Sequence, residues 1–94
     1  MLIRDLVLQP RDPGNEYWQA AFIELVDGRT ICIERPTATN GMYPQGTWFV
    51  IANWGTGDDP CHGPSEFEAQ AAFDHYRLNV GFKNNPALKP SGDT

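Results

Sequence analysis

Apolar and polar residues alternate along much of the first half of the chain, and this period of two predicts β-strands. In residues 17–26 both alternating faces are largely apolar, so this strand is expected at the centre of a sheet, with a helix covering at least one side. Asp27-Gly28 then supplies a hairpin signal, because Asp and Gly tolerate the positive φ angles of a tight turn. The predicted strands cover residues 2–9, 17–26, 30–35 and 47–54.

A helical period replaces the alternation after residue 64. Ser65 and Glu68 have the spacing of a capping box, and Gly81 is the expected stop. The helix carries one apolar stripe, formed by Ala69, Ala72, Phe73, Tyr76 and Val80. The pattern predicts an α+β fold: an antiparallel sheet of about four strands with one C-terminal helix packed on one face.

Chain length and turn-forming residues predict the domain organisation. A chain of 94 residues is expected to form a single domain, here residues 1–84, followed by a flexible tail at 85–94. The connection at residues 37–46 is longer than a hairpin needs, so we expect it to carry contacts as well as to join strands.

The balance of charge narrows the classes of partner. The net charge is −5, from 12 acidic and 7 basic residues, and no two basic residues are adjacent. This argues against binding to duplex nucleic acid or to an anionic membrane, and it suits solubility or a basic partner. No apolar run has the length of a signal peptide or a membrane span, so we expect a cytoplasmic protein with reduced thiols.

A polar corner between the last strand and the helix contains Asp58, Asp59, Cys61 and His62. It matches neither the paired ligand spacing of zinc sites nor the glycine-punctuated calcium loop. Cys61 could act as a nucleophile with His62 or His75, but the two aspartates would raise its pKa, and no oxyanion-hole pattern is visible. We therefore predict no catalytic residue, no metal and no cofactor, and a thiol- or metal-dependent activity at Cys61 is an alternative.

The aromatic residues suggest a contact surface. Trp18 and Trp48 are expected in the core, whereas Tyr43 in the long loop and Trp54 at a strand end are candidates for exposure. We predict a small non-enzymatic protein-binding module. One version is an acidic inhibitor of a nucleic-acid-handling enzyme, of the phage or mobile-element type such as anti-CRISPR or anti-restriction, whose carboxylates compete with phosphates. The predicted partner-binding residues are Met42, Tyr43, Trp54, Asp58, Asp59 and Glu66.

Three segments together resemble the WGR domain, over roughly residues 15–85. They are Asn15-Glu-Tyr-Trp18, Asp27-Gly-Arg29 and the helix from Ser65 to Phe73 with residues 79–84. The resemblance implies a small sheet-plus-helix module that binds nucleic acid, of a kind found with poly-ADP-ribose polymerases and in bacterial proteins.

The naming motif of that family is replaced in this chain. Glu34-Arg35-Pro36 stands where Trp-Gly-Arg is expected, and Trp54-Gly55-Thr56 offers Trp-Gly one strand later. A nucleic-acid-binding module is thus a second hypothesis. It requires three basic side chains to converge on one face, those of Arg29, Arg35 and Arg77.

Overall fold

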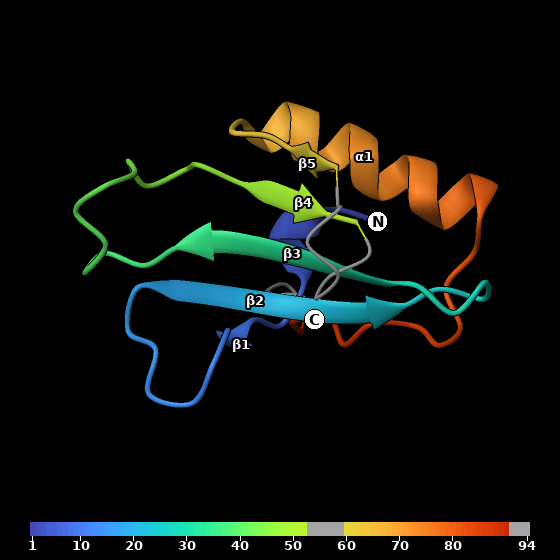
Figure 1. The fold of residues 1–94 in the computed structure, drawn as a ribbon, viewed down its shortest axis with the longest axis horizontal. Coiled ribbons are helices and arrows are strands. Elements are labelled where there is room, and N and C mark those ends of the chain that lie inside the picture. The colour runs from blue at the N-terminus through green and yellow to red at the C-terminus, as the bar shows by residue number, and fades with distance from the viewer. Residues whose placement is uncertain (53–59, 91–94) are drawn as a thin grey trace.

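A computed structural model describes residues 1–52 and 60–90 of the chain, and its main element is a five-stranded antiparallel sheet (Figure 1). The strands lie side by side in their chain order, β1-β2-β3-β4-β5. The expected α+β class is confirmed, with one strand more than the sequence predicts. The elements are η1 (Ile3–Asp5), β1 (Gln9–Pro10), β2 (Trp18–Glu24), β3 (Thr30–Pro36), β4 (Phe49–Ile51), β5 (Cys61–His62) and α1 (Glu66–Asn79).

The β2–β3 hairpin is the longest pairing in the sheet and has the predicted turn. Asp27 Oδ1 accepts a hydrogen bond from the Arg29 amide at 3.0 Å, and Gly28 has a φ of 93°. The pairs Ala21–Ile33 and Ile23–Ile31 lie on the face that α1 covers, and the alternate pairs lie on the opposite face. The predicted alternation of the two faces is therefore confirmed.

Helix α1 packs its apolar stripe against β4, β5 and η1. Ser65 Oγ accepts from the Glu68 amide at 3.0 Å, as the capping pattern predicts, and Gly81 follows the helix with a φ of 109°. Among the described residues, no helix is long and apolar enough to cross a membrane. The core between helix and sheet contains Ile3, Leu6, Ile23, Leu25, Ile31, Ile33, Trp48, Val50, Ala52, Ala69, Ala72, Phe73 and Tyr76.

The first predicted strand, residues 2–9, is wrong for most of its length. Residues 3–5 form the 3₁₀-helix η1, and only Gln9 and Pro10 pair with β2. Ile3 and Leu6 are both fully buried. Residues three apart share one side of a 3₁₀ turn, whereas a strand would place them on opposite faces.

The last predicted strand, residues 47–54, is shorter in the structure, where β4 covers Phe49–Ile51. Its end at Trp54 lies outside the described residues, as do Asp58 and Asp59. Strand β5 falls in the region predicted to be a polar loop, and it pairs with β4 through Val50–His62 and Ile51–Cys61.

The segment after residue 84 was expected to be a flexible tail. Residues 87–89 instead run along the N-terminal segment: Val7 N donates to Ala87 O at 3.0 Å, and Lys89 N donates to Asp5 O at 2.7 Å. The packed part of the chain therefore extends to Lys89, and residues 91–94 lie outside the described residues.

Candidate functional site

Two loops extend from the same end of the sheet, on the left of Figure 1. One joins β1 to β2 and the other joins β3 to β4. Between them is an open recess of about 600 Å³, lined by residues 11–18 and 40–42. We call it the loop recess.

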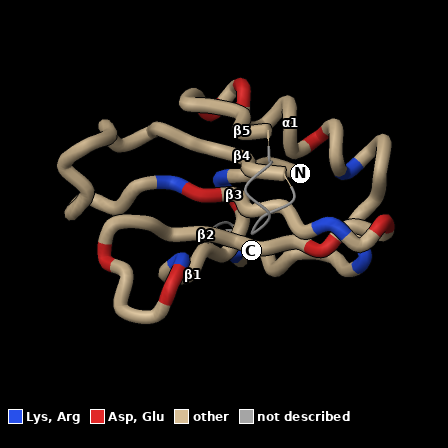
Figure 2. The backbone as a smooth tube through the Cα atoms, in the orientation of Figure 1, with Lys and Arg blue, Asp and Glu red and all other residues tan. Residues whose placement is uncertain are grey.

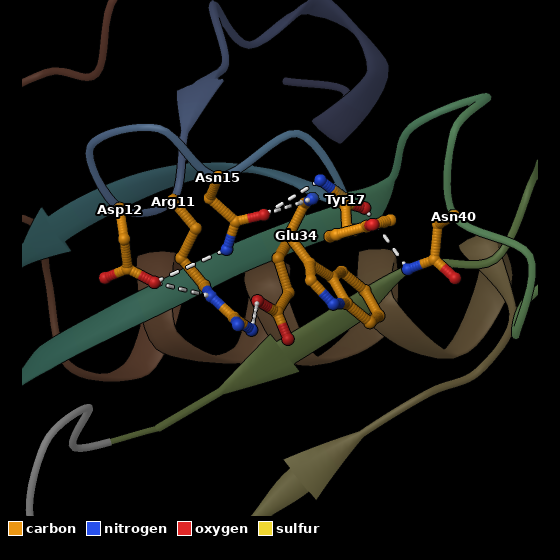
Figure 3. Close-up of polar contacts among 7 residues, drawn as sticks. Arg11, Asp12, Asn15, Tyr17, Glu34 and Asn40 are labelled. Atoms are coloured by element: carbon orange, nitrogen blue, oxygen red, sulfur yellow. Dashed lines mark hydrogen bonds and ion pairs between the residues drawn. The ribbon is translucent and has the colours of Figure 1, made fainter.

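The first loop is held in shape by the side chain of Asn15 (Figure 3). Asn15 Oδ1 accepts from the Tyr17 amide at 2.8 Å and from the Trp18 amide at 3.1 Å. The backbone N–H of Asn15 in turn donates to the backbone carbonyl of Asp12 at 2.9 Å. An Asn side chain that bonds backbone amides in this way replaces the hydrogen bonds of regular structure, so the entry into β2 is fixed.

The second loop is tied to the first by the buried Asn40. Its Nδ2 donates to the Tyr17 carbonyl at 3.2 Å, and the Thr37 amide donates to the same oxygen at 3.0 Å. Asn40 Oδ1 also accepts from the Met42 amide at 2.9 Å. The Tyr17 carbonyl therefore joins the two loops, and both sides of the recess keep a defined spacing.

An aromatic cluster supports this end of the sheet on the face opposite to α1. The Trp18 ring centroid lies 5.4 Å from that of Tyr43 and 5.9 Å from that of Phe49, and the Tyr43 and Phe49 centroids are 5.7 Å apart. Tilted aromatic pairs at this separation are favourable beyond the area they bury. Trp18, expected in the core, is instead half-buried at the edge of the recess.

A buried ion pair lies beside the aromatic cluster. Glu34 on β3 is 4% exposed, and its Oε2 accepts from Arg11 Nη1 at 3.0 Å. Burial raises the pKa of Glu34, and the Arg11 guanidinium offsets that rise only in part. Arg11 also places its guanidinium carbon 5.4 Å from the Trp18 ring centroid. These contacts direct Arg11 toward the sheet and anchor the first loop.

Large apolar side chains are exposed around the recess. Tyr17 is 49% exposed, Met42 84% and Tyr43 39%. Acidic positions also lie in the loop between β1 and β2 (Figure 2), where the carboxylates of Asp12 and Glu16 are exposed. The recess thus combines apolar contact surface with negative charge.

The predicted partner-binding residues fall into three groups. Met42 and Tyr43 lie together beside the recess. Glu66 lies outside it at the start of α1, where its carboxylate forms a two-bond ion pair with Arg4 at 2.9 and 3.1 Å. The other predicted residues, Trp54, Asp58 and Asp59, are outside the described part of the chain.

The alternative site at Cys61 has a thiol disfavoured from ionising. Cys61 lies on β5, and burial followed by the charge of Glu34 raises its pKa. The rings of His62 and His75 both lie against Tyr76, at centroid distances of 6.3 and 5.3 Å. Within the described residues, no group of three or more His, Cys, Asp and Glu could hold a metal ion.

Two of the three basic residues required for a nucleic-acid surface, Arg29 and Arg35, are separated along the sheet, and the third, Arg77, lies on α1. Arg29 precedes β3 and Arg35 lies near its end, so about 20 Å of strand separates them. Arg29 forms an ion pair with Asp27 at 2.8 Å, and Arg35 stacks on Trp48 with its guanidinium carbon 4.9 Å from the ring centroid. The structure does not bring these two cations together.

Comparisons with family models, curated proteins and solved structures gave no match to this chain. The resemblance to the WGR domain therefore stays a prediction.

Proposed function

We propose that this protein is a small non-enzymatic protein-binding module that contacts its partner through the loop recess and the side chains of Tyr17, Met42 and Tyr43. The observation that carries the proposal is the exposure of these three side chains on loops with a fixed backbone. Tyr and Met are enriched in protein interfaces, and Tyr is prominent among residues whose truncation weakens binding most.

The hydrogen bonds of the loops favour binding because they reduce its entropic cost. Asn15 and Asn40 already hold the backbone that presents Tyr17 and Met42. A partner therefore has less backbone to order on contact, and more of the interaction free energy remains as affinity.

The charge around the recess favours a basic partner. The chain has a net charge of −5, and Asp12 and Glu16 are exposed beside the apolar side chains. Complementary charge accelerates encounter and selects among partners. An acidic inhibitor that occupies the basic groove of a nucleic-acid-handling enzyme is the version of this function we favour. We also propose a cytoplasmic location, where thiols such as those of Cys32 and Cys61, which are not joined in a disulfide here, are kept reduced.

The test compares a double variant with a surface control. Tyr17→Ala with Met42→Ala removes apolar contact area from the recess, whereas Leu78→Ala removes a 70% exposed side chain from α1. Affinity purification from the native host with quantitative mass spectrometry identifies partners captured by the wild type, and calorimetry then measures their affinity. We expect the double variant to bind at least about tenfold more weakly, and the Leu78 variant to bind like the wild type.

Equal affinity of the wild type and a folded double variant would refute the proposed surface. Thermal unfolding of each variant checks that the fold is retained. If Leu78→Ala lowers the affinity as much as the double variant does, the interface lies on α1.

A further inference from the structure

The loop recess has more negative than positive side chains. Among the described residues that line the recess, Arg11 is the only cation, against Asp12 and Glu16. Arg11 is closest to Glu34, at 3.0 Å, and its contact with Asp12 Oδ2 is longer, at 3.4 Å. Glu16 forms no ion pair with any described residue. The recess therefore presents uncompensated negative charge to a partner.

The same recess offers aromatic and thioether surface beside that charge. Tyr17, Trp18 and Met42 line it, and Tyr17 and Met42 are exposed. Arg11 already stacks its guanidinium on Trp18, which shows that a cation fits against an aromatic ring here. Guanidinium is planar and weakly hydrated, so it can stack on a ring face while it donates hydrogen bonds to a carboxylate.

We infer that the partner inserts an arginine side chain into the loop recess, with its guanidinium against Tyr17 and its charge met by Glu16 and Asp12. This inference rests on the proposed function and gives the chemistry of the partner residue. Arginine is favoured over lysine because an ammonium group is more strongly hydrated and lacks a planar face for stacking. An apolar side chain could pack against the same aromatic and thioether surface, but it would leave the carboxylates without a counter-charge.

The experiment is a titration of the isotope-labelled full chain, followed by ¹⁵N NMR at low ionic strength. The probe is a heptapeptide of glycine and serine with arginine at its centre, and matched peptides carry lysine or norleucine there. We expect the arginine peptide to shift the amide signals of the two loops, around Asn15, Tyr17 and Met42. The lysine peptide should bind more weakly, and the norleucine peptide should leave these signals unchanged.

Isosteric variants separate a specific site from general attraction to an acidic protein. Asp12→Asn and Glu16→Gln should each weaken binding of the arginine peptide about threefold. Glu68→Gln is the matched control, because Glu68 is an exposed carboxylate on α1 that forms no ion pair with any described residue. This variant should bind like the wild type.

Several outcomes would overturn the inference. They are equal shifts with the norleucine peptide, absence of shifts at millimolar arginine peptide, or an equal loss of binding in the Glu68 variant. Failure of the proposed function would be distinguishable from these. If the partner needs Tyr17 and Met42 but binds the Asp12 and Glu16 variants with wild-type affinity, the surface stands and the arginine is excluded. If it needs neither set, both proposals fall.

Discussion

Glu34 occupies an unusual position for a carboxylate, enclosed on the sheet face opposite to the helix. Its ion-pair partner among residues 1–52 and 60–90 is Arg11, whose side chain is itself about a quarter exposed (24%). Removing an ionised group from water costs free energy, and only strong contacts inside the protein offset that desolvation cost. The raised pKa of Glu34 indicates that the offset here is incomplete. Through Arg11, Glu34 also anchors the loop that carries Tyr17. The free-energy cost of burying the Glu34 carboxylate therefore accompanies the contact that fixes the geometry of the loop recess.

This raised pKa predicts the direction of a pH effect on stability. The folded state holds the Glu34 proton more tightly than the unfolded state, so the contribution of Glu34 to the free energy of unfolding rises as the pH falls from 7 toward 5. Glu34→Gln lacks this contribution. Urea unfolding at pH 7, 6 and 5 should show the wild type gaining stability relative to the variant at lower pH. A constant difference, or one of opposite sign, would contradict the assignment.

Gly63 is required for close approach between β5 and the strand beside it. A Cβ at this position would lie 2.5 Å from Phe49 Cδ1 and 2.5 Å from the Trp48 carbonyl oxygen. We expect Gly63→Ala to lower the free energy of unfolding by about 1–3 kcal/mol, because the backbone must move to admit the methyl group. Gly41→Ala, where the Cβ meets no atom within 4 Å, should change it by less than about 0.5 kcal/mol. Chemical denaturation of both variants checks the pair.

At the scale of elements, periodicity predicts the regular parts of the fold well. The β2–β3 hairpin and α1 each have enough residues for a pattern to repeat, and burial follows that pattern. Strand β5 has only two residues, Cys61 and His62, so no alternation can reveal it. The sequence predicts a strand in place of η1 because five of the eight residues in the segment 2–9 are apolar. Ile3 and Leu6 nevertheless have the i, i+3 spacing of a turn.

Only one side of the loop recess is predictable from the sequence. Met42 and Tyr43 stand out as apolar residues in a long loop, and the structure places them at the site. The sequence does not single out Tyr17 or Glu16, because Tyr17 is the first residue of the predicted strand 17–26 and Glu16 lies in the turn before it. The contact between the loops runs through a backbone carbonyl, which no side-chain pattern records. Asn15, placed two residues before Tyr17, was the available signal for an ordered turn.

The start of α1 depends on one side chain. Ser65 Oγ accepts from the Glu68 amide at 3.0 Å and so satisfies an amide that has no partner within the helix. Ser65→Ala should lower the free energy of unfolding by about 1 kcal/mol, and Ser65→Asp should retain most of the stability. Denaturant midpoints at constant slope provide the measurement. If alanine and aspartate behave alike, the cap contributes little.

At the scale of the whole molecule, the two ends of the described chain pack against each other. Ala87 and Lys89 hydrogen-bond to Val7 and Asp5, and Leu88 forms a bridge with Leu6. Next to this contact, the Ile3 amide donates to Gln70 Oε1 at 2.8 Å, which ties η1 to α1. Residues more than sixty positions apart thus cover one edge of the core.

Truncation tests this packing. A chain that ends at Asn84 loses both backbone hydrogen bonds to the N-terminal segment and the cover over Leu6, so its free energy of unfolding should fall by about 1–3 kcal/mol. A chain that ends at Pro90 keeps these contacts and is the matched control. Hydrogen exchange should show faster exchange of the Val7 amide in the shorter chain alone. Equal stability and equal exchange of the two chains would show that residues 85–90 contribute nothing to the fold.

The asparagine-based architecture of the two loops has a further consequence for evolution and engineering. Asn15 and Asn40 bond main-chain groups, and within the described residues the side chains of Glu16 and Met42 form no hydrogen bond that holds the loops. In the proposed binding function, recognition and folding therefore depend on different positions. The outward positions can accept new side chains, as antibody loops do on their framework, and the scaffold can acquire new targets without being rebuilt.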